Sequence, residues 1–227
     1  MAGKLIAVEG LDGSGKATQT KLLCDALAEK GVRVRKISFP DYAQPSSVLA
    51  KIYLDGEFGT DPNAVNAYAA SSFFAVDRYA SYMKFWRDEY LSGSVIVADR
   101  YTTSNMVFHL SKLPKAEHES FLNWLQDYEY GKLGLPRPDV TIYLDMPQAV
   151  SQKLLSHRYN GNEGKKDIHE KNAAYQKECH ESAVYAAERL NWKIIPCAAG
   201  DAPRTVDEIH QDIIKVITEE LPLYVSI

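Results

Sequence analysis

The stretch LIAVEGLDGSGKATQ, residues 5–19, constrains the fold more than any other part of the chain. An apolar strand leads into a glycine-rich turn, and the turn leads into a helix. Gly10, Gly15 and Lys16 have the spacing of a phosphate-binding loop, in which backbone N–H groups surround phosphate oxygens and a lysine reaches the outer phosphates. A turn that merely joins a strand to a helix is the alternative, but the flanking strand and helix are the context that the motif requires. The predicted triphosphate-binding residues are Gly10, Leu11, Asp12, Gly13, Ser14, Gly15, Lys16, Ala17 and Thr18.

Ala17 departs from this motif. The motif has Ser or Thr directly after the lysine, and the hydroxyl of that residue binds Mg²⁺. Because alanine has no hydroxyl, we expect other groups to hold the metal. Thr18 is one alternative source of a hydroxyl, although a helical step of about 100° turns its side chain away from the direction of residue 17.

Apolar runs and helical spacing alternate along the rest of the chain. Besides the strand before the phosphate loop, strands are predicted at 32–39, 94–98, 139–146 and 192–197. Helices are predicted at 15–30, 46–54, 62–91, 147–157, 168–190 and 205–221, with two more between Tyr101 and Tyr130 that are broken near Pro114. This alternation predicts an α/β fold with three layers, in which helices cover both faces of a five-stranded parallel sheet. With 227 residues, the chain is most simply one domain, residues 1–227.

The composition argues against several classes of partner. With a net charge of −4, the chain has no overall basic field that would draw it to nucleic acid or to an anionic membrane. No apolar run approaches the ~20 residues of a membrane span. Cys24, Cys179 and Cys197 are widely separated, which suits reduced thiols in the cytosol better than disulfides or a zinc site. We therefore expect a cytoplasmic protein that binds small molecules, and neither nucleic acid nor membrane.

Polar residues follow the predicted strand at 94–98. Asp99 lies where nucleotide-binding proteins of this class place an acidic residue near the metal, and Arg100 can clamp phosphate with two parallel hydrogen bonds. Phe74 and Arg78 are four residues apart on the helix predicted at 62–91, so they share a face and suit a planar base. A core aromatic beside a solvated charge is the alternative for that pair. The role in base binding gains support because Ser104 and Asn105 can face the same cleft.

The segment 158–166, RYNGNEGKK, has the composition of a mobile flap. Its glycines allow hinging, and Arg158, Lys165 and Lys166 could meet phosphate charge as the flap closes and excludes water. A solvated surface loop has the same composition and remains the alternative. By contrast, no role is needed for the six histidines, and most of them should be solvated.

Taken in order, these motifs resemble the thymidylate kinase family over nearly the whole chain. The resemblance rests on the phosphate loop, Phe39-Pro40, residues 74–78, Asp99-Arg100-Tyr101 with Ser104-Asn105, and PDVTIYLD at 138–145. The Asp-Arg-Tyr element after a buried strand is the most specific of them. The resemblance implies a phosphate-loop kinase fold with a lid at about 158–168. It also implies transfer of the γ-phosphoryl group of ATP to dTMP with Mg²⁺, and a homodimer.

The resemblance also assigns roles to residues. Lys16, Arg100, Asp12 and Arg158 would be catalytic. Asp12 would meet the sugar 3′-hydroxyl, Phe74 would stack on thymine, and Arg78 and Asn105 would read its edge. The full expected dTMP-binding set is Asp12, Phe39, Tyr42, Phe74, Arg78, Arg100, Ser104 and Asn105.

The metal ligands and two substitutions complete these expectations. Glu170 matches an acidic position of the family, so Asp12, Asp99 and Glu170 are the predicted carboxylate ligands of Mg²⁺, with ATP oxygens and waters. Tyr42 stands where many members have an arginine for the dTMP phosphate. Gly13 and Ser14 occupy the part of the loop where some members carry a basic residue, so the positive charge should come from the flap instead.

Two other functions remain open at this point. A nucleotide-switched binding protein would have no acceptor pocket, so Phe74, Arg78 and Asn105 would have no joint purpose. A deoxynucleoside kinase would phosphorylate a neutral hydroxyl and would need an acidic general base.

Overall fold

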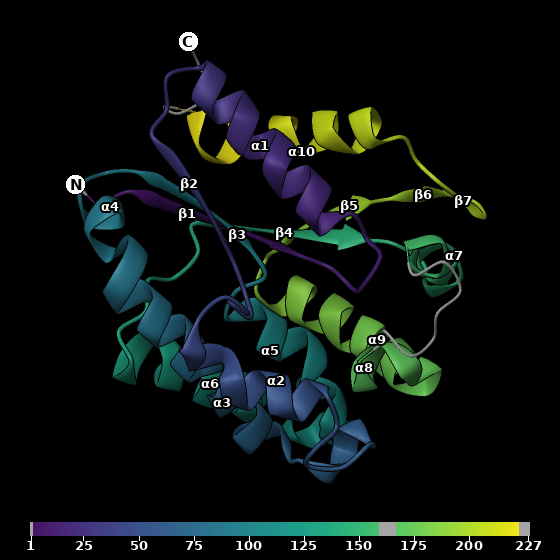
Figure 1. Cartoon of the computed structure of the whole chain (residues 1–227). Helices are drawn as coiled ribbons and strands as arrows, with labels where there is room; N and C mark the ends of the chain where they lie inside the picture. The colour runs from purple at the N-terminus through teal and green to yellow at the C-terminus, as the bar shows by residue number, and fades with distance from the viewer. Residues whose placement is uncertain (1, 159–166, 223–227) are drawn as a thin grey trace.

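A five-stranded parallel sheet forms the centre of the molecule, in the order β2-β3-β1-β4-β5 (Figure 1). The computed structural model describes residues 2–158 and 167–222. The strand bounds are β1 (Lys4–Glu9), β2 (Val34–Ser38), β3 (Val95–Asp99), β4 (Val140–Asp145) and β5 (Lys193–Pro196). The predicted sheet is therefore confirmed. A small antiparallel pair, β6 (Ala198–Ala199) and β7 (Ala202–Pro203), was not predicted, because each strand has only two residues.

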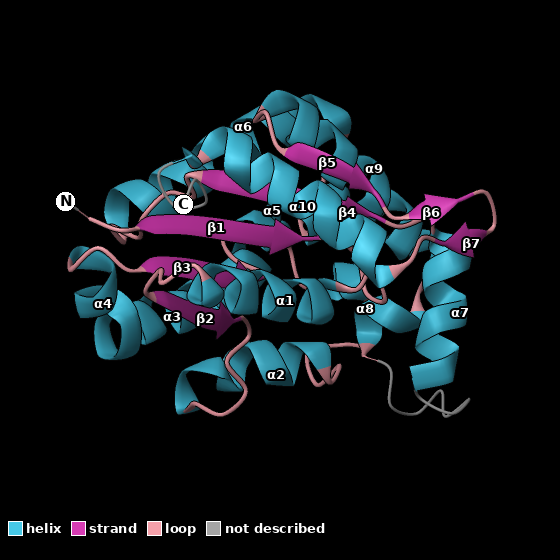
Figure 2. Ribbon diagram, turned by 90° about the horizontal axis from the view of Figure 1, so that it is seen from above, coloured by secondary structure: helices cyan, strands magenta, loops and turns pink. Residues whose placement is uncertain are grey.

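Helices cover both faces of this sheet (Figures 1 and 2). Because side chains alternate along a strand, Ile6 and Val8 pack on one face with α1 (Lys16–Glu29) and α10 (Val206–Glu220), whereas Leu5 and Ala7 pack on the other. That second face carries most of the remaining helices. The helices not yet named are α2 (Val48–Leu54), α3 (Ala67–Ser81), α4 (Arg87–Leu91), α5 (Thr103–Phe108), α6 (His118–Gln126), α7 (Gln148–Arg158), α8 (Ile168–Lys171) and α9 (Ala173–Arg189). No helix among the described residues is both long and apolar enough to span a bilayer.

Two predicted helices are divided in the structure. The stretch 62–91 contains a 3₁₀ turn at Pro62–Ala64, then α3, a π-helical segment at Tyr82–Trp86 and α4. Asn66 causes the first break, because its side chain accepts a hydrogen bond from the N–H of Ala69 and so begins α3. Asn172 likewise caps α9 through the N–H of Tyr175, which separates α8 from α9 within the stretch 168–190. Helical periodicity continued through both breaks, so the pattern did not reveal these caps.

The strand order places one site at the carboxyl edge of the sheet. From β1 the chain runs to β2 on one side of the sheet, and the connection after β3 crosses β1 to reach β4 on the other side. At such a switch point a crevice opens beyond the strand ends, and open α/β sheets bind ligands there. The phosphate loop after β1 and the residues after β3 both lie at this edge.

Candidate active site

The phosphate loop has the backbone conformation that its glycines permit. Gly13 and Gly15 have φ of 80° and 90°, a region that favours glycine. Gly10 is needed for another reason, because a Cβ there would lie 2.9 Å from the carbonyl oxygen of Leu144. The loop is thus held tightly against the end of β4.

Lys16 is buried at the start of α1 and folds onto its own loop. Its Nζ donates hydrogen bonds to the carbonyl oxygens of Gly10 at 2.9 Å and Leu11 at 2.8 Å. Burial, and then the nearby guanidinium of Arg100, lower the pKa of Lys16 to about 8. The ammonium group therefore stands beside the loop in a buried position that disfavours its charge, with the carboxylates of Asp12 and Asp99 nearby.

Glu9, the last residue of β1, organises the turn after β3. Its fully buried carboxylate accepts hydrogen bonds from the N–H of Tyr101 at 2.9 Å and from the hydroxyls of Thr103 at 2.6 Å and Ser104 at 2.7 Å. Burial raises the pKa of Glu9. This contact was missed from the sequence, although an acidic residue at the end of an apolar strand was a usable signal. Ser104 thus has a structural bond in addition to its place at the predicted site.

Asp12 and Arg100 form an ion pair across the loop. Arg100 lies in the left-handed region with φ of 67°, and its Nη1 is buried without a hydrogen-bond partner among the described residues. Although burial opposes ionisation, Arg100 and Lys16 lower the pKa of Asp12. The carboxylate is therefore ionised, and part of the guanidinium remains available for an anion.

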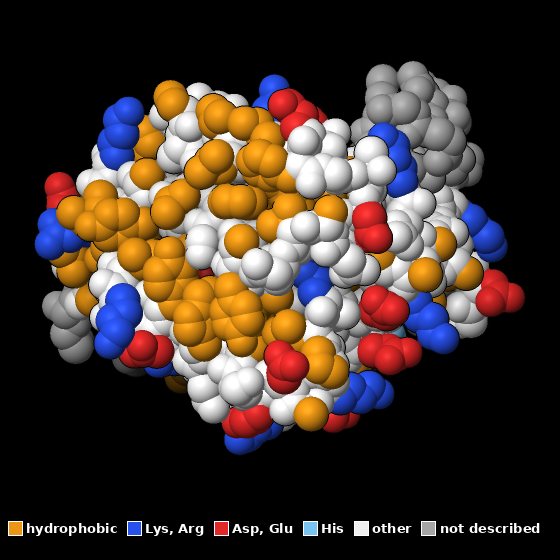
Figure 3. Space-filling view, turned by 90° about the horizontal axis from the view of Figure 1, so that it is seen from below, with side chains coloured by type: hydrophobic (Ala, Val, Ile, Leu, Met, Phe, Trp, Pro, Cys, Tyr) orange, Lys and Arg blue, Asp and Glu red, His pale blue; other side chains and the backbone are white. Residues whose placement is uncertain are grey.

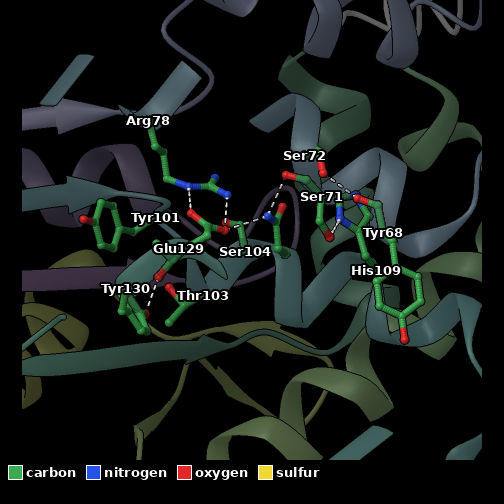
Figure 4. A network of polar contacts seen from close by, with 12 residues as sticks. Tyr68, Ser71, Ser72, Arg78, Tyr101, Thr103, Ser104, His109, Glu129 and Tyr130 are labelled. Atoms are coloured by element: carbon green, nitrogen blue, oxygen red, sulfur yellow. Dashed lines mark hydrogen bonds and ion pairs between the residues drawn. The ribbon is translucent and has the colours of Figure 1, made fainter. Parts of the chain in front are cut away.

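Arg78, one of the proposed base-binding residues, lies in a buried polar network with Glu129 (Figure 4). Arg78 donates from Nε and Nη2 to the two carboxylate oxygens of Glu129, at 2.7 and 2.6 Å, and both side chains are at most 1% exposed. Asn105 donates from Nδ2 to Glu129 at 2.9 Å and to the carbonyl oxygen of Ser71 at 3.1 Å. Phe74 lies beside them, with its ring edge-on to Tyr53. Sequence reasoning missed Glu129, which comes from the π-helical segment Asp127–Lys132, because no motif surrounds it.

A cavity of about 460 Å³ joins the phosphate loop to this network, and its size is typical of a site for a small ligand. The predicted residues that line it are Asp12, Gly13, Gly15, Lys16, Ala17, Phe39, Tyr42, Phe74, Arg78, Asp99, Arg100, Ser104, Asn105 and Glu170. Four of the predicted residues that the structure describes do not line the cavity. Three of them are buried in the loop, namely Gly10, Leu11 and Ser14, and the fourth, Thr18, is exposed on α1. The side chain of Arg158 and residues 159–166, which include Lys165 and Lys166, lie outside the described part of the chain.

The three predicted metal ligands do not form a preassembled site. Within residues 2–158 and 167–222, no group of three or more His, Cys, Asp or Glu side chains is arranged to hold a metal. Asp12 is engaged with Arg100, and Glu170 accepts a hydrogen bond from the N–H of Asp167 as part of the cap of α8. Asp99 lines the cavity near Lys16. Since Mg²⁺ commonly uses one or two carboxylates plus phosphate oxygens and waters, the donor set still fits a nucleotide-bound ion.

The expectation that most histidines are solvated was wrong. His109, His118 and His169 are buried, and His109 and His169 also line the cavity. Burial lowers the pKa of His169 to about 3, and it lowers that of His109 well below its ordinary value, so both imidazoles are neutral. His109 contacts the hydroxyl of Ser71 through Nδ1 at 2.9 Å. His109 directly follows α5, and no motif around it signalled that it would become part of the site.

A phosphate-binding loop that opens onto a cavity lined by an aromatic ring and buried hydrogen-bonding side chains defines a phosphate-loop nucleotide kinase. The chain belongs to the thymidylate kinase family, because the model of that family matches residues 8–213.

Individual relatives agree with this assignment. The chain is 33% identical over 188 residues to the thymidylate kinase of Mycobacterium tuberculosis, covering 80% of this chain and 84% of that one. It is 28% identical over 222 residues to the human thymidylate kinase, covering 96% and 91%. Its fold is similar to the solved structure of thymidylate kinase from Candida albicans, with a TM-score of 0.69, 22% identity, and coverage of 96% and 92%.

Proposed function

We propose that this protein transfers the γ-phosphoryl group of ATP to dTMP, which yields ADP and dTDP. One observation carries this proposal: the same cavity reaches two groups of residues. Its phosphate end has Lys16 and Arg100, and its base end has Phe74, Arg78 and Asn105. The acceptor phosphate would then lie between the loop and the base-binding residues. Membership of the thymidylate kinase family supports the same reaction.

The chemistry needs positioning and charge neutralisation more than proton transfer. The attacking oxygen belongs to a phosphate monoester, which is already anionic at neutral pH, so no strong base is required. Lys16 and Arg100 are placed to offset charge on the transferred group. The carboxylate of Asp12, held by Arg100, would orient both the arginine and the sugar 3′-hydroxyl. A lid at about 158–168 would add further positive charge, for which the candidates are Arg158, Lys165 and Lys166.

For Mg²⁺, we propose Asp99 as the principal carboxylate, with Asp12 or Glu170 as a second partner. When bound, the ion would neutralise charge on the ATP phosphates. Ala17 is exposed and lines the cavity, whereas Thr18 does not, which argues against Thr18 as the source of the missing hydroxyl.

A coupled assay tests the reaction against its two rivals. ADP release would be measured with dTMP, with thymidine, with dUMP and with no acceptor. We expect turnover to depend on a nucleoside monophosphate and to be highest with dTMP. Faster turnover with thymidine would indicate a deoxynucleoside kinase, and hydrolysis that is independent of acceptor would indicate a nucleotide switch.

We also propose that the protein is a homodimer that associates through an apolar face on α3 and the π-helical segment that follows it. Tyr68, Val76, Tyr79 and Met83 recur at helical spacing and are 37–50% exposed. Figure 3 shows hydrophobic side chains gathered on the face seen from below, where α3 and α6 lie in Figure 1. Large continuous apolar surfaces of this kind mark protein interfaces.

Light scattering after size-exclusion chromatography tests this interface. Val76→Glu should shift the protein to the mass of one chain, because a charge would be buried without a partner. Val206→Glu is the matched control, since Val206 is 48% exposed at the start of α10, close to the 41% of Val76, but does not belong to this face. A monomeric wild type, or a dimer that survives Val76→Glu, would contradict the proposal.

A cytoplasmic location and a single domain over residues 1–227 remain proposals as well. Cys24, Cys179 and Cys197 are free thiols, which suits a reducing compartment. The match of the family model to residues 8–213 supports one continuous kinase domain.

A further inference from the structure

Glu129 is a buried carboxylate that no motif singled out, and it contacts two residues of the cavity wall at once. One of its oxygens accepts from both Arg78 and Asn105, and the other accepts from Arg78 alone. Glu129 does not line the cavity itself. Any effect on a ligand must therefore pass through the two side chains that it holds.

The contacts of Asn105 determine which end of its amide can face a ligand. Its two polar neighbours, the carbonyl oxygen of Ser71 and the carboxylate of Glu129, can only accept hydrogen bonds. The amide nitrogen must therefore point toward them, and both of its hydrogens are used. The atom left for the cavity is Oδ1, which is an acceptor.

Arg78 is constrained in the complementary way. Nε and Nη2 are bound to Glu129, so Nη1 is the guanidinium nitrogen left for a ligand, and it can only donate. The fork of two parallel bonds also fixes the plane of the guanidinium. The wall of the cavity thus offers one fixed donor and one fixed acceptor.

We propose that Glu129 is a positioning residue that sets this donor and acceptor pattern, and thereby makes the site specific for a pyrimidine with an imide N–H beside a carbonyl group. Thymine offers a carbonyl oxygen to Arg78 and its N3–H to Asn105. A 4-amino pyrimidine reverses both groups and would meet donor with donor and acceptor with acceptor. This inference rests on the proposed dTMP kinase function.

The experiment compares dTMP with 5-methyl-dCMP, which differs from dTMP only in these two groups. The wild type should prefer dTMP by about 10²- to 10⁴-fold in kcat/KM, because unpaired buried polar groups reject the wrong base. Glu129→Gln replaces one acceptor by a donor, so the Asn105 amide is no longer held in one orientation. We expect this preference to fall by about tenfold or more, through the KM for the monophosphate, with little change in the KM for ATP.

Two further variants separate positioning from general structural damage. Glu119→Gln is the matched control, because Glu119 holds Arg189 with the same two-bond geometry on the exposed surface. This variant should change neither the preference for dTMP over 5-methyl-dCMP nor the KM for the monophosphate. If Glu129→Gln does not fold, Glu129→Asp keeps the buried charge but is too short to hold both partners, and it should show the same loss of discrimination.

The outcomes distinguish this inference from the proposed function. A wild type that does not phosphorylate dTMP overturns the function. A wild type that does so, but whose preference for dTMP over 5-methyl-dCMP is unchanged in folded Glu129 variants, overturns only the role of Glu129.

Discussion

The two ends of the cavity differ in how completely the protein pairs its own charged side chains. At the base end, Arg78, Glu129 and Asn105 are buried and bonded to one another. At the phosphate end, Nη1 of Arg100 and Oγ of Ser14 are buried without a partner within the described residues. Because a buried unpaired polar group costs about 1–3 kcal/mol, the phosphate end carries a free-energy cost that a bound anion can relieve.

This difference teaches how the binding energy is divided. The base end is ordered during folding, so the base binding that we propose there requires little further organisation, and specificity would follow from the fixed pattern. The phosphate end holds two cations, and Nη1 of Arg100 has no partner there, which suits an anion whose charge is redistributed during the reaction. We therefore expect changes at the phosphate end to act mainly on kcat, and changes at the base end to act mainly on the KM for dTMP.

The largest effect should come from Lys16→Ala. In the proposed mechanism Lys16 contacts the transferred phosphoryl group, so we expect kcat to fall by about 10²- to 10³-fold or more when the ammonium group is lost. Thermal denaturation should show a folded protein, and Lys21→Ala, an exposed lysine on the same helix, should retain full activity. Turnover near that of the wild type would show that Lys16 does not contribute to phosphoryl transfer.

Phe74→Ala tests the base end. Stacking of an aromatic ring on a base contributes about 1–3 kcal/mol, so the KM for dTMP should rise about tenfold while the KM for ATP changes little. Phe73→Ala is the control, because Phe73 contacts Tyr53 and Phe58 but does not line the cavity. An equal rise in both KM values would mean that Phe74 packs in the core and does not stack on the base. It would contradict the expectation that changes at the base end act mainly on the KM for dTMP.

The pH dependence of ATP binding should report Lys16. Its pKa in the free protein is lowered to about 8, so the lysine loses its charge as the pH rises through 8, and the KM for ATP should increase by up to about tenfold between pH 7 and 9. Bound phosphates favour the charged form, so kcat should change less. Lys16→Arg keeps its charge across this range and should abolish the increase. A KM that rises equally in both proteins would point to another group.

The smallest effect concerns the metal. Ala17→Thr restores a hydroxyl in the cavity wall, and it should leave kcat intact while lowering the Mg²⁺ concentration for half-maximal rate by about two- to threefold. Asp99→Asn should raise that concentration. Thr18→Ala should leave it unchanged, because Thr18 is outside the cavity wall. If only Thr18→Ala shifts the Mg²⁺ concentration for half-maximal rate in a magnesium titration, the proposal that carboxylates bind the metal is wrong.

The sequence by itself determined the sheet, the phosphate loop and most of the cavity wall. These features depend on local patterns: apolar strands, glycines at fixed spacing, and polar residues directly after a strand. Because parallel strands bring their carboxyl ends to one edge, Asp12, Asp99 and Arg100 could be assigned to the same site without coordinates. Phe74 and Arg78 followed from helical spacing on a single helix.

Only the tertiary structure decided what each polar group is paired with. Glu129 lies 51 residues from Arg78 in the sequence, and Glu9 lies 92 residues from Tyr101; neither pairing follows from any local pattern. The same holds for His109, whose burial depends on helices that pack around it. Burial and pairing determine the charge and the orientation of a side chain, and both arise from contacts between distant segments. The sequence therefore identified which residues line the cavity, while the fold determined which of their atoms remain free to bind.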